Sequence, residues 1–130
     1  MTDQEFWKQL KNCFATNETQ KQIPSLINRA EKDHLDLPVV VDKENKKEKY
    51  HAIYHGTLKL LHCATTIPTG PGIYTDPLQP DQKISTVPLN GLFRKLKADG
   101  YDGIVFIHKG GLSGFEWNDF NGKEVRQMIL

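Results

Sequence analysis

The sequence has few cysteines, no long apolar run and almost no net charge. Its two cysteines, Cys13 and Cys63, are too few for a disulfide framework and lack the paired spacing of a zinc site, which indicates a reducing compartment. No apolar run approaches the ~20 residues that a membrane span needs, and residues 1–12 lack the apolar stretch of a secretory signal. We therefore expect a cytoplasmic protein, in its own cell or in a target cell, that has no membrane partner.

The charge balance excludes a whole-molecule field for binding nucleic acid. Seventeen basic and sixteen acidic residues leave a net charge of +1, so any such binding would need a local basic patch. The 130 residues, 38% hydrophobic and 25% charged, are typical of a soluble globular protein with one domain.

Glycine is missing from the first part of the chain, and this absence divides the sequence. All ten glycines follow Tyr54, whereas residues 1–50 carry 18 of the 33 charges. Within a single domain of residues 1–130, we therefore expect an N-terminal helical segment with a charged loop over 1–49 and a core over 50–130.

Helical periodicity marks the N-terminal segment. Capping-box spacing at Thr2 and apolar residues at helical intervals predict a helix over 3–14, and Pro24 suits the first turn of a second helix. The run 37–41 is β-branched, and residues 42–49 are polar enough to predict an exposed loop.

Strands and turns dominate the second part. The patterns predict a strand over Tyr50–His55, a short helix over Thr57–Ala64, a short strand over Ile73–Thr75 and a helix over Leu89–Asp99 that ends at Gly100. Further predicted strands are Gly103–Ile107, Phe115–Phe120 and, after an Asn121-Gly122 turn, Glu124–Ile129. One clear helix among several strands indicates an α+β fold.

Histidines and a cysteine first suggest a metal site. His51, His55, His62, Cys63 and His108 are candidate ligands, but His51 and His55 on one strand face would stand ~13 Å apart. The segment also lacks the glutamate of the helical zinc-protease motif, so we expect no metal. His62 and Cys63, as sequence neighbours, point apart, and core packing explains the cysteine better than a nucleophile does.

Two other features have ordinary explanations. The loop Gly70-Pro71-Gly72 lacks the further residues of a dinucleotide fingerprint or a P-loop. Arg94, Lys95 and Lys97, with Lys109, could form a small basic patch, although a solvated helix face explains them as well.

Three segments in a fixed order point to a family. They are Ile53-Tyr54-His55-Gly56-Thr57, then Gly72-Ile73-Tyr74-Thr75-Asp76-Pro77, and then Gly100–Phe106, which is followed after a glycine-rich loop by Glu116. In these segments, residues 50–130 resemble the ADP-ribosyltransferases of the diphtheria-toxin and poly(ADP-ribose)-polymerase type. The signature of that family is a histidine, a tyrosine and a late glutamate.

The resemblance implies both a fold and a site. It implies split antiparallel sheets of the ADP-ribosyltransferase type with N-terminal helices. It also implies that His55, Gly56, Thr57 and Tyr74 bind NAD, with His55 on ribose hydroxyls and Tyr74 stacked on nicotinamide, and that Glu116 is catalytic. NAD would be a substrate, and the acceptor a protein or a nucleic acid. Position 114 is glycine, so the acceptor motif of arginine-modifying toxins is missing.

The chemistry suits a single carboxylate. Nicotinamide leaves a cation as a neutral molecule and needs no protonation, whereas a glycosidase usually needs two carboxylates. Glu116 could stabilise the oxocarbenium-like ribose electrostatically. The resulting expectation is an NAD-dependent mono-ADP-ribosyltransferase, as a toxin, an effector or a phage-encoded modifier.

Two alternatives stay open at this point. One keeps the fold and changes the reaction, to an RNA 2′-phosphotransferase-like or NAD-hydrolysing enzyme. The other is a non-catalytic interaction or immunity module built on similar elements.

Overall fold

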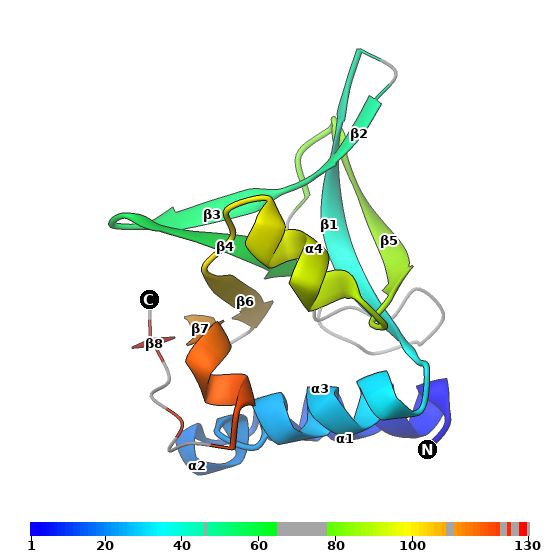
Figure 1. Ribbon diagram of the computed structural model, residues 1–130, viewed down its shortest axis with the longest axis vertical. Helices are drawn as coiled ribbons and strands as arrows, with labels where there is room; N and C mark the ends of the chain where they lie inside the picture. The colour runs from blue at the N-terminus through cyan, green and yellow to red at the C-terminus, as the bar shows by residue number, and fades with distance from the viewer. Residues whose placement is uncertain (46, 65–77, 109–110, 123–124, 126–127, 130) are drawn as a thin grey trace.

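The computed structural model describes residues 1–45, 47–64, 78–108, 111–122, 125 and 128–129. Helices and one sheet make up these residues (Figure 1). The helices are α1 (Asp3–Cys13), α2 (Asn17–Gln20), α3 (Ile23–Lys32), α4 (Leu92–Ala98) and the 3-10 helix η1 (Trp117–Phe120). The strands are β1 (Asp36–Glu44), β2 (Lys47–Tyr50), β3 (Ala52–His55), β4 (Leu58–Cys63), β5 (Gln82–Pro88), β6 (Gly103–His108), β7 (Gly111–Glu116) and β8 (Met128–Ile129). The α+β class predicted from the sequence is confirmed.

The N-terminal helices begin where their caps predict. The Thr2 side chain accepts a hydrogen bond from the backbone N–H of Glu5, which satisfies one of the free donors at the start of α1. Pro24 lies in the first turn of α3, and the predicted apolar face of that helix is buried. Both helices lie along one side of the molecule (Figure 1).

The sheet is mixed and continuous across the described strands. Its order is β2-β1-β4-β6-β7-β8, with β5 on the other edge of β1 and β3 on β4. The expectation of split antiparallel sheets is therefore corrected on two points: hydrogen bonds join all the strands, and β4 pairs with β6 in parallel. The parallel pair arises because β5 and α4 lie between β4 and β6 in the chain, which gives the length that a crossover needs.

A break at His51 makes the sheet fork. β2 pairs with β1, whereas β3 pairs with β4, and the two strands are separated only by His51. In Figure 1, β1, β2 and β5 form one arm, the β3–β4 hairpin forms another, and α4 lies in front of the point where they diverge. One run of backbone, 47–55, thus passes from one arm to the other.

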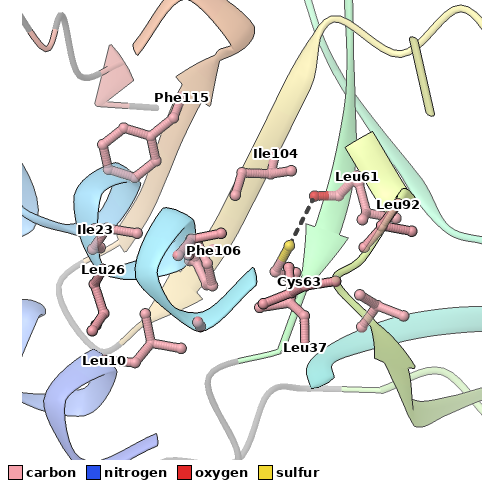
Figure 2. Packing of buried hydrophobic residues seen from close by; sticks show 14 of the residues in the cluster. Leu10, Ile23, Leu26, Leu37, Leu61, Cys63, Leu92, Ile104, Phe106 and Phe115 are labelled. Atoms are coloured by element: carbon pink, nitrogen blue, oxygen red, sulfur yellow. Dashed lines mark hydrogen bonds between the residues drawn. The ribbon is translucent and has the colours of Figure 1, made fainter. Parts of the chain in front are cut away.

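One hydrophobic cluster joins the two parts of the chain. Phe6, Ile23 and Ile27 from the helices pack with Ile104 and Phe106 from the sheet, and all five are fully buried. Figure 2 shows Ile23, Ile104 and Phe106 in this cluster, with the helices on one face of the sheet. The expected boundary at 49/50 falls inside β2, so it divides the sequence by composition and not by structure.

Several predicted elements were wrong. The helix predicted over Thr57–Ala64 is instead the strand β4, because Leu60 and Leu61 are buried where β4 pairs with β1, β3 and β6. The predicted loop over 42–49 is an exposed hairpin of β1 and β2 that turns at Asn45, whose φ is 47°. The expected strand over 115–120 stops at Glu116 and continues as η1, and the glycine-rich loop before Glu116 is largely β7.

Other predictions hold in part or concern residues outside the described ranges. The helix predicted over 89–99 is α4, followed by Gly100 with a φ of 85°. The strand predicted over 124–129 is described only at β8. Gly70-Pro71-Gly72 and the strand over Ile73–Thr75 lie outside the described residues. Within the described part of the chain, no helix combines the length and apolar composition of a membrane span.

Candidate functional site

The histidine predicted to bind NAD lies at the tip of the β3–β4 hairpin. His55 is opposite Leu58, and Gly56 and Thr57 form the two-residue turn between them. Gly56 has a φ of 60°, the left-handed conformation that glycine adopts without strain in such a turn. His55, Gly56 and Thr57 are all exposed and accessible to a ligand.

The predicted catalytic glutamate ends β7. Glu116 is exposed, and its backbone N–H donates a hydrogen bond of 2.9 Å to the carboxylate of Asp119, which is buried. Glu116 is opposite Gly103, the first residue of β6. A Cβ at Gly103 would collide with the backbone of Phe115, so only glycine permits this close approach of the strands.

Strand register relates the two residues. On β3, His55 is opposite Leu58 of β4. Two residues further along β4, Leu60 is opposite Gly103 of β6, which is itself opposite Glu116 of β7. Because alternate residues share a face, His55 and Glu116 lie on the same face and near the same end of the sheet. They are three strand spacings apart, roughly 14 Å across the sheet. The structure thus brings them to one surface but not into contact, and Tyr74 lies outside the described residues.

A polar cluster that sequence reasoning did not identify lies further along the sheet, and two of its members, Asp42 and His51, also line the cleft described below. The Asp42 carboxylate is 2.9 Å from the Nδ1 atom of His51 and accepts a 2.9 Å hydrogen bond from the side-chain amide of Gln82. The ring of His62 has its centroid 5.5 Å from that of His51. We call Asp42, His51, Gln82 and His62 the histidine cluster.

The two imidazoles of the histidine cluster have different electrostatic environments. Burial, followed by the nearby charge of His51, lowers the pKa of His62 to about 4, and neither ring nitrogen of this buried residue has a partner among the described residues. Burial acts to raise the pKa of Asp42, but hydrogen bonds from His51 and Gln82 outweigh it and the pKa is lowered. His62 is therefore neutral near pH 7, and Asp42 is ionised.

This arrangement is suited to proton transfer. A carboxylate on Nδ1 fixes the orientation of an imidazole, and the Nε2 atom of His51 makes no hydrogen bond with a described residue. His51 is partly exposed, so a ligand proton could reach that nitrogen. His55 and His62 do not join His51 in a metal site: across the described ranges, no three ligand-type side chains converge.

A cleft lies where the two arms of the sheet diverge. Its volume is about 740 Å³, which is in the range of small-molecule sites. Tyrosine and lysine side chains from β2, β3, β4 and α4 line it together with Tyr101, and we call it the tyrosine cleft. The lining residues include Tyr50, Tyr54, Lys59, Lys95, Asp99 and Tyr101.

Two lysines of the tyrosine cleft lie over tyrosine rings. The Nζ atom of Lys59 is 4.3 Å from the ring centroid of Tyr101, and that of Lys95 is 5.5 Å from the ring centroid of Tyr50. The Tyr101 hydroxyl donates a 3.0 Å hydrogen bond to the backbone carbonyl of Tyr50 and so connects Tyr101 to β2. Burial raises the pKa of Tyr101.

The cysteines and the predicted basic patch have structural roles. Cys63 is fully buried, and its thiol lies 3.7 Å from the carbonyl oxygen of Leu61, as Figure 2 shows; Cys13 is also in the core. Core packing, as predicted, accounts for both. On α4, Lys97 lies over the ring of Trp117 and not with Lys95 in the cleft, so these two lysines are separated. Lys109, the other lysine of the predicted patch, lies outside the described residues.

The histidine cluster had a weak signal in the sequence. Asp42 is nine residues from His51, and the hairpin that brings them together was predicted as a loop. The sequence did contain one signal for β4, the two-residue turn Gly56-Thr57 between two segments of strand-like pattern. A hairpin recognised there would have brought His62 back towards His51. Gln82 is 40 residues from Asp42, and no local pattern relates them.

Comparison with protein-family models, with curated proteins and with solved structures gives no match for this chain.

Proposed function

We propose that the chain is an NAD-dependent mono-ADP-ribosyltransferase that modifies a protein or nucleic-acid acceptor. The observation that supports this proposal best is the register that places His55 and Glu116 on one face and near one end of the sheet. Both residues are exposed, so a substrate can reach them. The order of the histidine, tyrosine and glutamate segments in the sequence supports the same activity.

In the proposed reaction the bond between ribose C1′ and the nicotinamide nitrogen breaks, and its electron pair leaves with nicotinamide. The acceptor nucleophile forms the new bond to C1′ and releases its proton to solvent or to a base. Glu116 stabilises the positive charge that develops on the ribose, which is electrostatic catalysis aimed at the transition state. His55, with Gly56 and Thr57, holds ribose hydroxyls, and Tyr74 stacks on the nicotinamide ring.

His55 and Glu116 are about three strand spacings apart, roughly 14 Å, a distance that an extended dinucleotide can span. Leu60 and Gly103 lie in register between β3 and Glu116 and are buried, so the proposed NAD contacts the exposed residues at the two ends of this row. His55 and Glu116 then act on different parts of one bound molecule.

The test is an NAD turnover assay with purified protein and cell lysate. We expect nicotinamide release and a labelled macromolecule, and a fall of about 10²–10³-fold in rate for Glu116→Gln. Glu18→Gln is the matched control, because Glu18 is exposed on α2 and its carboxylate faces Lys21 of its own turn. Undiminished turnover by Glu116→Gln, with an unchanged melting temperature, would overturn the role of this glutamate.

The same assay and two further measurements address the alternatives. Nicotinamide release without a labelled acceptor would indicate an NAD-hydrolysing enzyme. Turnover of a 2′-phosphorylated RNA that is lost in Arg94→Ala would favour a phosphotransferase-like enzyme, since Arg94 is exposed on α4. Absence of calorimetric NAD binding at millimolar concentration would favour the non-catalytic module.

A further inference from the structure

The tyrosine cleft lies on the opposite face of the sheet from His55 and Glu116. Tyr54 and Lys59 are paired across the β3–β4 hairpin, and His55 and Leu58 form the next pair. Successive pairs of an antiparallel hairpin project to opposite faces. The cleft is therefore separate from the surface on which the proposed transfer would occur, and its side chains need their own explanation.

Tyr54 is the ring of the cleft that is open to a ligand. Its side chain is 67% exposed, whereas Tyr101 is buried and Tyr50 is half-buried. The rings of Tyr50 and Tyr101 already face lysine ammonium groups. Among the described residues only Tyr54 and Leu78 are large hydrophobic side chains with high exposure. An exposed aromatic face at the wall of a cleft is a platform for stacking a planar ring.

The charges that remain unpaired in the cleft are mostly positive. Three lysines and three carboxylates line it, but two of the carboxylates have partners: Glu48 pairs with Lys83, and Asp42 with His51 and Gln82. The lysines, namely Lys49, Lys59 and Lys95, form no ion pair within the part of the chain that the structure describes. Asp99 is left as the single unpaired carboxylate, so the cleft suits one anionic group beside a group that donates hydrogen bonds.

A planar ring, a hydroxylated part and one anionic group together describe a mononucleotide. We propose that the tyrosine cleft binds a nucleoside monophosphate. The base stacks on Tyr54, the phosphate lies between the ammonium groups of Lys59 and Lys95, and hydroxyl or amino groups of the ligand donate to Asp99. The two lysines are held in place by their tyrosine rings, which reduces the entropy lost when they bind phosphate.

A longer nucleic acid fits the observations less well. Tight binding of a polyanion needs many phosphate contacts, and this chain has a net charge of only +1 and a cleft whose formal charges balance. A peptide without acidic or phosphorylated side chains would leave the two ammonium groups without a partner. The small volume and the mixed charges of the cleft favour a ligand with one phosphate.

The experiment is isothermal calorimetry of the full chain at low salt, with AMP, adenosine, inorganic phosphate and an oligoadenylate as separate probes. We expect saturable one-to-one binding of AMP, with adenosine and phosphate each at least about tenfold weaker. Tyr54→Ala should weaken AMP binding by at least about fivefold, the equivalent of one stacked base. Lys95→Gln should weaken the binding of AMP but not that of adenosine.

Three control variants should bind AMP like the wild type. Lys97→Gln changes the same charge on the same helix outside the cleft, and Tyr54→Phe keeps the ring; both should bind AMP like the wild type. Glu116→Gln should also bind AMP normally, so that failure of the proposed transferase and failure of this proposal are distinguishable. Absence of saturable AMP binding up to about 10 mM, unchanged affinity in folded Tyr54→Ala, or affinity that rises steeply with oligonucleotide length would each overturn the mononucleotide site.

Discussion

The imidazole rings of His51 and His62 lie 5.5 Å apart between centroids, yet only His51 has a carboxylate partner. His62 is 3% exposed, and both of its ring nitrogens are without hydrogen bonds to described residues. A buried polar group without partners normally costs free energy, so His62 reduces the stability of this fold unless a ligand or a partner satisfies it.

The first prediction concerns stability between pH 6.5 and pH 4. The pKa of His62 falls from 6.5 to about 4 on folding, so the unfolded chain binds this proton before the folded chain does. Stability should therefore be unaffected by this group above pH 6.5 and decrease by up to about 3 kcal/mol as the pH falls to about 4. Urea denaturation at half-unit pH steps measures this loss.

Two variants isolate the contribution of His62. His62→Leu should flatten the stability profile between pH 6.5 and pH 4 and raise stability at pH 5. His34→Asn is the control, because His34 is exposed and has a φ of 58°, which asparagine tolerates. An equally steep profile in His62→Leu would show that another group controls the acid response.

The second prediction concerns a lower pH range and Asp42. Its pKa is depressed below 3.8 in the folded state, so its contribution is present above pH 3.8 and is lost as the pH falls through the folded pKa. Asp42→Asn should remove this last phase of acid destabilisation and retain the phase due to His62. Asp3→Asn, an exposed change in α1, should retain both phases.

The third prediction concerns Gly103 at the start of β6. Gly103→Ala should destabilise the protein by about 2–4 kcal/mol, because the new Cβ would collide with the backbone of Phe115 and force β6 and β7 apart. Gly100→Ala provides the comparison. A Cβ at Gly100 would meet no other atoms, but the residue has a φ of 85°, which strains any side chain. The free energy of unfolding should therefore fall by only about 1–2 kcal/mol. Thermal and chemical denaturation should rank the two variants in this order.

The fourth prediction concerns the hydroxyl of Tyr101. Tyr101→Phe keeps the ring beneath Lys59 but removes the hydrogen bond to the carbonyl of Tyr50. We expect a loss of about 1–2 kcal/mol in the free energy of unfolding, since a part-buried acceptor loses its donor. AMP affinity should change little. A large loss of affinity at unchanged stability would mean that the hydroxyl contacts the ligand directly.

The fifth prediction separates two tyrosines. In the proposed transferase, Tyr74→Ala should raise the KM for NAD roughly threefold to tenfold, the value of one aromatic contact. Tyr54→Ala should leave this KM unchanged, because Tyr54 lies on the other face of the hairpin from His55. The reverse result would place NAD in the tyrosine cleft.

Local patterns in the sequence predicted three of the helices. α1 and α4 lie near the ranges that caps, periodicity and Gly100 indicated, and α3 begins near Pro24, whereas α2 was not predicted. These signals are local, because a helix makes its hydrogen bonds within four residues of itself. The α+β class followed from the same reading.

The sheet was less predictable, because its partners are distant in the sequence. β4 contains Leu58, Leu60 and Leu61, which favour a helix locally, and only its neighbours β1, β3 and β6 make it a buried strand. The charged hairpin was read as a loop for the opposite reason, since its strands are exposed and carry no apolar alternation. The tyrosine cleft depends on both of these elements, so it could not be anticipated without them.

The break at His51 has a consequence for any two ligands of this protein. The backbone from Lys47 to His55 carries Tyr50 and Tyr54 on the wall of the cleft and ends at the histidine of the opposite surface. A ligand that shifts or stiffens residues 47–55 from one face of the sheet changes the free energy of binding of a ligand on the other face. By thermodynamic reciprocity the effect is equal in both directions, and a single stretch of nine residues would be the coupling element.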